Sequence, residues 1–369
     1  MTSQAHASQW IHSAEALQEW LAPIENQACL GMDTEFMRRD TFYPQLALLQ
    51  LEHAGRYALV DPTAFEIGTL LQDLQHRQAL VTIMHSASED LEALDQLLPN
   101  GPDRLYDTQI AASLAGLGFG LSYRALVETV AGVVLDKGET RSDWLQRPLT
   151  ESQRGYATLD VVYLQAIRQH VDEKLNALGR QDWLTEECER LKQRGAGRHT
   201  DAQPQRHVRP AAEWPAEQQA MLRRLLLWRE QTARDINRPK TWLLDDTHAL
   251  SLAERPPRDR NELDQRTRGL RALRAAQREA LHELLQSPVS TEEITATEPV
   301  LGLPQGEAKR ALASMKQVVD TQAAQLDLPA GLLCPRKVLE DYVLSRQTPA
   351  LLHGWRGPLL ADALASRLP

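Results

Sequence analysis

The stretch CLGMDTEF, residues 29–36, decides how this chain begins to fold. Its apolar first half predicts a buried strand, and side chains two residues apart on a strand project from the same face. Asp33 and Glu35 therefore point in one direction at the end of a hydrophobic element. Taken alone, such a pair is most often two solvated acids beside a turn. In apolar surroundings, however, two carboxylates are costly unless a positive charge neutralises them, so the stretch also predicts a cation site.

A second stretch, GYATLDVVYL at residues 155–164, carries a tyrosine and an aspartate four positions apart. Upstream, Thr150 followed by Gln153 is typical of a capping box and predicts the start of a helix. On that helix Tyr156 and Asp160 share one face, one turn apart, so a phenol and a metal-bound carboxylate can reach the same water molecule. Singly, they would be a core or rim aromatic residue and a solvated acid.

A third stretch, HSASEDLEAL at residues 85–94, follows a strand-like apolar run over 79–84. Asp90 opens the helix predicted here, where an acid often serves only to complement the helix dipole. No Lys or Arg lies in any of the three stretches, so a hard divalent cation such as Mg²⁺ or Mn²⁺ is the expected neutralising partner. Two such ions can clamp the attacking and leaving oxygens of a phosphodiester.

The order D-x-E, then an acid in a SED context, then Y-x-x-x-D resembles the DEDDy branch of the 3′-to-5′ exonuclease superfamily, and in detail the bacterial ribonuclease D family. Further matching stretches are TFYPQLALLQL (41–51), YDTQIAASLAG (106–116), LSYRALVE (121–128) and LDKGETRSDWLQRPLT (135–150). The resemblance covers about residues 10 to 190. It implies that two divalent ions, Mg²⁺ or Mn²⁺, are bound by Asp33, Glu35, Asp90 and Asp160, with Tyr156 positioning the nucleophilic water.

The same resemblance implies a fold and a function. We expect an α/β RNase H-like exonuclease domain with a mixed five-stranded sheet, followed by two all-α HRDC-type domains. We expect a 3′-to-5′ exoribonuclease that removes 5′-mononucleotides by two-metal-ion hydrolysis. The implied partner is RNA with a single-stranded 3′ end, in particular tRNA precursors during 3′ maturation, and no obligate protein partner is evident.

The residue patterns independently favour a mixed sheet. Strand candidates are residues 28–36, 46–51, 57–60 and 79–84, and the second and third are joined through residues 53–55 as a hairpin. A hairpin requires antiparallel pairing, whereas strands separated by helices pair in parallel, so both kinds are expected. The glycines at 116, 118 and 120 follow a helix rather than a strand and are interpreted as a connection.

The stretch QRGAGRHTDAQPQRHVRPAA, residues 193–212, is rich in Gly, Pro, Arg and His and predicts a linker. The expected division is an exonuclease domain over 1–192, this linker, a first HRDC domain over 213–292 and a diverged second over 293–369. Helical patterns fill the second half, including one continuous helix over 260–286. A faint repeat relates Asn237-Arg238-Pro239 to Asp327-Leu328-Pro329, which predicts two helical modules.

The two modules resemble HRDC domains to different degrees. The first contains WREQTARDINRPKTWLLDDTHALSLAERPP (228–257), and the second ends with TPALLHGWRGPLL (348–360). The family uses such modules as substrate-binding accessories. For the second copy, helices that merely stabilise or dimerise the catalytic domain remain an alternative.

Charge is distributed unevenly along the chain. The net charge is −9, yet residues 190–280 hold 20 Lys and Arg against 12 Asp and Glu, and the remainder holds 21 against 38. A local basic excess can supply sequence-independent attraction to phosphates. Equally, arginines such as Arg271, Arg274 and Arg278 can form the solvated face of a helix.

Four further residues are candidates for holding the substrate. Phe36 and Tyr43 follow the strand of the D-x-E motif and can stack on a terminal base, although core packing is as good an interpretation for Phe36. Lys137 and Arg141, in a stretch that the resemblance places near the active site, are candidate phosphate contacts. Trp144 in the same stretch is more readily assigned to packing.

Two other functions remain open. A single-strand DNA 3′-to-5′ exonuclease would use the same chemistry, and nothing in the sequence reads a 2′-hydroxyl. A catalytically inactive nucleic-acid-binding scaffold is the other alternative, although all five site residues are present. A helicase is excluded because no phosphate-binding P-loop occurs. Three scattered cysteines, no apolar leader and no long apolar run favour a cytoplasmic protein rather than a secreted or membrane protein.

Overall fold

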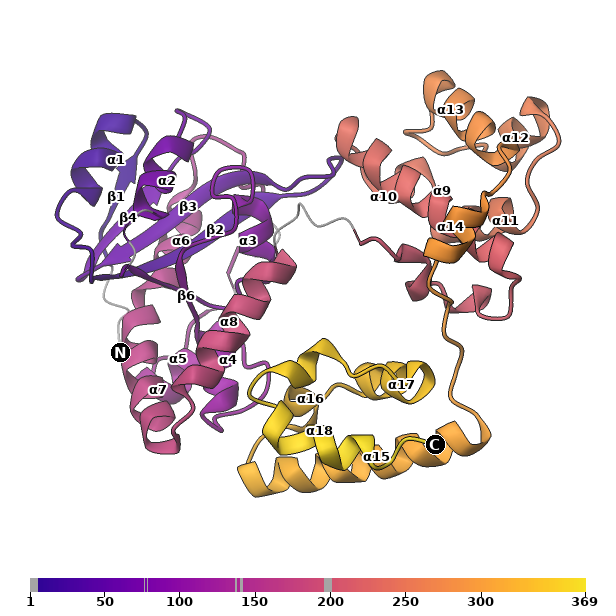
Figure 1. Cartoon of the computed structure of the whole chain (residues 1–369). Helices are drawn as coiled ribbons and strands as arrows, with labels where there is room; N and C mark the ends of the chain where they lie inside the picture. The colour runs from indigo at the N-terminus through magenta and orange to yellow at the C-terminus, as the bar shows by residue number, and fades with distance from the viewer. Residues whose placement is uncertain (1–5, 76, 78, 137, 140–141, 196–200) are drawn as a thin grey trace.

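The computed structural model describes residues 6–75, 77, 79–136, 138–139, 142–195 and 201–369. An α/β first half is followed by a helical second half (Figure 1). The first half contains β1 (Ser8–Ile11), α1 (Ala14–Leu21), β2 (Cys29–Met37), β3 (Gln45–His53), β4 (Arg56–Val60), α2 (Gly68–Gln75), β5 (Val81–Met84), α3 (Ser88–Leu94), β6 (Arg104–Asp107), α4 (Thr108–Leu114), α5 (Tyr123–Ala131), α6 (Glu151–Val162), α7 (Leu164–Leu178) and α8 (Gln181–Gly195).

The second half is helical throughout its described residues. It contains the 3₁₀ helices η1 (Pro204–His207) and η2 (Arg209–Ala211), then α9 (Ala216–Asp235), α10 (Lys240–Leu243), α11 (Asp246–Glu254), α12 (Arg260–Arg266), α13 (Ala275–Gln286), α14 (Thr291–Ala296), α15 (Gly306–Leu326), α16 (Ala330–Leu333), α17 (Arg336–Ser345), η3 (Ala350–His353) and α18 (Gly357–Ala365). None of the helices described here is long and apolar enough to cross a membrane.

Within the described residues, six strands form one sheet in the order β1-β4-β3-β2-β5-β6. The sheet is mixed as predicted, because β2, β3 and β4 pair antiparallel while β1, β5 and β6 pair in parallel with their neighbours. The predicted count of five strands is wrong. The strands without a sequence signal are β1 and β6, which form the two edges of the sheet and have four residues each.

Strand β2 lies inside the sheet, between β3 and β5. Its first half is buried, as the apolar run predicted, and its pairing with β3 shifts register between Glu35 and Phe36. Such a bulge bends a strand and re-aims its side chains, and bulges are common beside active sites. The β3–β4 hairpin is confirmed, with Ala54 and Gly55 at positive φ, the conformation that a tight hairpin turn needs.

Helix α6 begins with the predicted capping box, in which Thr150 and Gln153 satisfy each other's backbone N–H groups. It packs against β2, β3 and β4, and its Ala157 joins a small buried cluster with Leu48 and Trp144. Helix α6 ends at Val162 and α7 begins at Leu164, so the two helices can take different directions over the sheet.

The continuous helix predicted over residues 260–286 is wrong. Helix α12 ends at Arg266 and α13 begins only at Ala275, with Gly269 at φ 93° between them. A residue at positive φ cannot continue a helix. The charged and apolar residues on both sides keep helical spacing, so the sequence pattern does not reveal the break. The segment between the two helices places the Arg271 guanidinium over the Trp242 ring, 5.3 Å from its centroid.

The faint repeat in the sequence corresponds to a repeated corner. After α9, Asn237 adopts φ 48° and Pro239 precedes the short helix α10; after α15, Asp327 adopts φ 50° and Pro329 precedes α16. Asn and Asp tolerate the left-handed conformation better than most residues, and proline suits the position just before a helix. The corner at 237–239 and the corner at 327–329 are called corner 1 and corner 2 below.

Corner 1 attaches the first helical module to the α/β domain. The loop of residues 38–44, between β2 and β3, extends to α9 and α10 (Figure 1). The Asn237 Oδ1 atom accepts hydrogen bonds from the backbone N–H groups of Phe42 and Tyr43, at 3.0 and 3.1 Å. Arg238 forms an ion pair of 2.9 Å with Asp40.

Corner 2 and its neighbours attach the second module to α8. Arg180 donates a hydrogen bond of 2.6 Å to the carbonyl of Leu326, next to corner 2. The rings of Trp183 and Trp355 are stacked, with centroids 4.2 Å apart. Arg356, which is almost fully buried, forms an ion pair with the buried Glu187.

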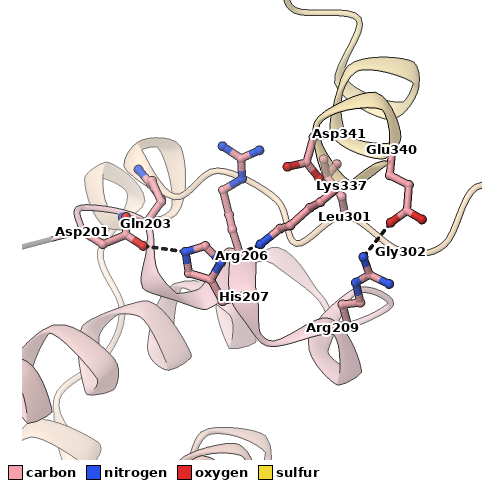
Figure 2. A pocket seen from close by; sticks show the side chains of 10 residues that line it. All are labelled: Asp201, Gln203, Arg206, His207, Arg209, Leu301, Gly302, Lys337, Glu340 and Asp341. Carbon is pink, nitrogen blue, oxygen red and sulfur yellow. Dashed lines mark hydrogen bonds and ion pairs between the residues drawn. The ribbon is translucent and has the colours of Figure 1, made fainter. Parts of the chain in front are cut away.

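The two helical modules meet at the start of the second half. Figure 2 shows this joint, where His207 lies between Asp201 and Lys337 and where Arg209 pairs with Glu340. A cavity of about 360 Å³ lies among these residues. Val208 and Ala211, inside the predicted linker, are buried against the first module, so the described part of that segment is packed rather than extended.

Candidate active site

The structure brings the three predicted acidic stretches to one place. Asp33 and Glu35 lie on β2, Asp90 in the first turn of α3, and Asp160 on α6, while both α3 and α6 pack against β2. Asp90 is buried and the other three acids are half-buried. The central position of β2 therefore allows acids from α3 and α6, which are far apart in the sequence, to approach the acids of β2.

The pKa values of these acids show that their charges act on one another. Burial, and then repulsion from Asp90, Asp160 and Glu35, raises the pKa of Asp33 well above its ordinary value. Burial and the neighbouring acids raise the pKa of Glu35 to about 9 and that of Asp160 to about 8. The pKa of Asp90 is raised to about 6, chiefly by burial, although a hydrogen bond from Thr34 opposes the shift.

This donor set fits divalent cations. Oxygen-only ligands suit Mg²⁺ and Mn²⁺, and the main causes of the pKa shifts of the four acids include no described Lys or Arg. Within the described ranges, no three His, Cys, Asp or Glu side chains stand close enough together to hold an ion as they are. Mutual repulsion keeps carboxylates apart, so binding would require small side-chain rotations toward a cation, which would remove that repulsion.

Tyr156 lies on the same helical face as Asp160, as the spacing predicted. Burial, together with the charges of Asp160, Glu35 and Asp33, raises its pKa, so the phenol stays protonated and can donate a hydrogen bond. Its ring lies 6.1 Å from that of the buried Trp144. Trp144 is therefore a packing residue, as predicted.

Two cavities meet at Tyr156. The first has a volume of about 580 Å³ and is lined by Thr34, Glu35, Phe36, Met37, Arg38, Arg39, Ser86, Glu89, Asp90, Ser142, Trp144 and Tyr156. The second has a volume of about 370 Å³ and is lined by Ser122, Tyr123, Arg124, Leu135, Asp136, Tyr156, Leu159 and Asp160. The first carries Arg38 and Arg39, and the second combines Arg124 with apolar side chains, so charged and apolar surfaces lie on both sides of Tyr156.

Two positioning residues have no signal in the sequence. The Thr34 hydroxyl donates a hydrogen bond of 2.5 Å to Asp90, which fixes α3 against β2. The Tyr123 hydroxyl donates to the carbonyl of Leu159 at 3.0 Å and accepts from the Tyr163 N–H at 3.1 Å. Tyr123 therefore stabilises the break between α6 and α7. Thr34 could have been suspected only from its position between the two acids of the motif.

The four residues predicted to hold the substrate lie in different places. Phe36 is half-buried and lines the first cavity, where stacking remains a prediction. Tyr43 lies in the loop that contacts corner 1 and is not a wall residue of either cavity. Lys137 and Arg141 lie outside the described residues.

Comparisons with known proteins agree with the geometry. A family profile described as 3′-5′ exonuclease matches residues 8–176. The chain is 38% identical to ribonuclease D of Xanthomonas oryzae pv. oryzae over 95% of this chain and 96% of that protein. It is 30% identical to ribonuclease D of Escherichia coli K12, over 98% of both chains.

A solved structure is also similar over nearly the whole length. The crystal structure of Escherichia coli RNase D, described as an exoribonuclease involved in structured RNA processing, superposes with a TM-score of 0.84. The sequence identity is 29%, and the match covers 98% of each chain. The helical second half is thus part of the similarity, as is the α/β domain.

Proposed function

Because the chain belongs to the ribonuclease D family and is a 3′-to-5′ exoribonuclease, we propose that Asp33, Glu35, Asp90, Asp160 and Tyr156 form its active site. Catalysis is divalent-metal-dependent. The observation that carries the assignment is the gathering of four acids from three elements around β2, where the charges of their neighbours in the set help to raise the pKa values of Asp33, Glu35 and Asp160. Perturbed acids that gather beside a cavity are typical of functional sites.

We propose that the four carboxylates hold two ions, Mg²⁺ or Mn²⁺. Asp33 suits the bridging position, since its pKa responds to all three other acids. Glu35 and Asp160 would complete the coordination of one ion, and Asp90 would hold the other ion directly or through water. Bound there, the ions would polarise the scissile phosphate and offset its developing charge. The neutral Tyr156 phenol would orient the attacking water, releasing 5′-mononucleotides.

The substrate class is tested with single-stranded RNA and DNA of one sequence, compared side by side. We expect the RNA to shorten from its 3′ end with release of 5′-mononucleotides when Mg²⁺ or Mn²⁺ is present. Recognition of the 2′-hydroxyl should make RNA the faster substrate by about tenfold, which corresponds to one hydrogen bond of about 1.4 kcal/mol. Excess chelator should stop the reaction, and added metal should restore it.

Either of two results would contradict this proposal. Equal rates on RNA and DNA would favour the DNA exonuclease alternative. The absence of any chelator-sensitive release would favour the inactive scaffold.

Tyr156→Phe is expected to lower kcat by about a hundredfold, because the phenyl ring keeps the packing against Trp144 but cannot orient water. The four carboxylates are unchanged, so Mn²⁺ should bind with wild-type affinity. Single-turnover rates and calorimetric titration with Mn²⁺ measure the two quantities separately. A loss of metal affinity as large as the loss of rate would assign Tyr156 to the metal site instead.

Other parts of the assignment follow from the family. We propose that transfer-RNA precursors are among the substrates and that the protein acts in the cytoplasm, which its free cysteines suit. We also propose that residues 1–192 form the exonuclease domain, 193–212 a linker, and 213–292 and 293–369 two HRDC-type domains. The repeated corner supports two copies of one module.

A further inference from the structure

A separate cavity of about 360 Å³ lies where the loop 38–44 meets the first helical module. Its lining residues are Asp40, Ile236, Arg238, Trp242, Arg271, Ala272, Arg274 and Gln277. It exists because the helix expected over 260–286 is broken, which places the segment before α13 beside α10. The volume is within the range of small-molecule and nucleotide sites.

The cavity has an excess of positive charge. Of its three arginines, Arg238 is paired with Asp40 at 2.9 Å. Arg271 and Arg274 are exposed, and neither forms an ion pair with any residue that the structure describes. In contrast, the cavity in Figure 2 has its arginines paired, Arg209 with Glu340 and Arg206 with Glu298. Two unpaired guanidiniums beside a cavity favour an anionic ligand with phosphate geometry.

The remaining wall suits a nucleobase. Trp242 is half-buried, and the Arg271 guanidinium lies over its ring, so the two planar groups form a surface on which a base can stack. The Gln277 Oε1 atom is buried and lacks a hydrogen-bond partner among the described residues. A buried acceptor of this kind needs a donor, which a ribose hydroxyl or an exocyclic amino group can supply.

The cavity adjoins the active site along one short loop. Arg38 and Arg39 line the cavity of the catalytic acids, and the next residue, Asp40, lines this one. Consecutive Cα atoms are about 3.8 Å apart, so the two cavities lie on either side of the same few residues. The loop is held in place at corner 1, where Asn237 binds the backbone of Phe42 and Tyr43.

We propose that this cavity binds a nucleotide of the substrate strand upstream of its 3′ end. Arg271 and Arg274 contact its phosphates, and the base stacks on the surface formed by Trp242 and Arg271. The inference rests on the proposed exonuclease function, since the strand reaches this cavity while its 3′ end occupies the active site. Only a substrate that is long enough to occupy both the active site and this cavity would therefore bind to the first module.

The test uses the double variant Arg271→Ala/Arg274→Ala in the full chain. Both side chains are exposed, so the fold should be retained. The matched control is Lys309→Ala/Arg310→Ala, which removes the same charge from exposed positions of α15 in the second module. Binding is measured in an Asp160→Asn background with single-stranded RNAs that increase in length by one nucleotide, beginning with a dinucleotide.

We expect the affinity of the protein with Arg271 and Arg274 in place to rise at the RNA length that first reaches the cavity. The double variant should lack this rise, bind long RNA about tenfold more weakly, and show a dependence of log affinity on log salt that is shallower by about 1.4. In the active enzyme, KM for long RNA should rise while kcat and dinucleotide cleavage stay unchanged. The control should behave as wild type.

A length profile that is unchanged in the double variant, or a loss of affinity that the control shares, would overturn the proposal. Failure of the proposed exonuclease function would have a different signature. In that case the wild-type protein itself would not release mononucleotides from the dinucleotide in a chelator-sensitive way, whatever stands at 271 and 274.

Discussion

Replacing Asp160 with Asn is expected to lower kcat on single-stranded RNA by at least about a thousandfold, equivalent to about 4 kcal/mol of transition-state stabilisation. Asn keeps the size of the side chain but removes the negative charge that would hold a cation. The same substitution should not destabilise the metal-free protein. Because folding raises the pKa of Asp160 to about 8, this carboxyl must take up a proton when the chain folds at neutral pH, and a neutral amide avoids that cost.

Rate and stability must therefore be measured together for Asp160→Asn. Thermal unfolding without metal should occur at or above the wild-type temperature, and the stabilisation that Mn²⁺ gives the wild type should be lost. Asp320→Asn is the matched control, because Asp320 is exposed on α15 in the second module. Activity of Asp160→Asn within a few fold of wild type at saturating metal would remove Asp160 from the metal site.

Replacing Arg356 with Ala should lower the free energy of unfolding by about 3–5 kcal/mol, the cost of leaving one partner of a buried ion pair alone. Burial would by itself raise the pKa of Glu187, but the hydrogen bond and charge of Arg356, with the Trp355 indole, lower it below its ordinary value. Arg356 also donates to the carbonyl of Leu332. Removing it leaves both Glu187 and that carbonyl without their main donor.

Urea unfolding followed by tryptophan fluorescence measures this effect, since the stacked Trp183 and Trp355 lie at the same contact. Arg260→Ala is the control, because Arg260 pairs with Glu279 at an exposed position, where loss of a pair costs at most about 1 kcal/mol. If the two variants lost similar stability, the attachment of the second module would not depend on the buried pair.

Sequence patterns predicted what is locally encoded. The apolar run of β2, the hairpin after it and the capping box of α6 are each specified by neighbouring residues, and all three are present. The active-site residues stay a prediction that rests on the same local rules, since strand alternation and helical spacing fix which side chains share a face. Convergence of the three stretches depends on the order of the strands in the sheet, which no local pattern gives, and only the resemblance to a family implied it.

The features that the sequence did not predict depend on long-range pairing or on local backbone angles. β1 and β6 are four residues long, half polar, and become strands only by pairing with a formed sheet. The break before α13 contains non-helical backbone angles at Thr267, Gly269 and Arg274. The role of Thr34 depends on Asp90, 56 residues away. No local pattern reports any of these.

The two corners have a consequence for how the molecule can open. The loop 38–44 contacts the first module through exposed polar groups at corner 1 and through the half-buried Phe42, whereas corner 2 lies beside a buried ion pair and stacked indoles. Thermal fluctuations should therefore separate the first contact far more often than the second. Because the covalent chain and corner 2 keep the first module at a high effective concentration near its loop, separation is rapidly reversed.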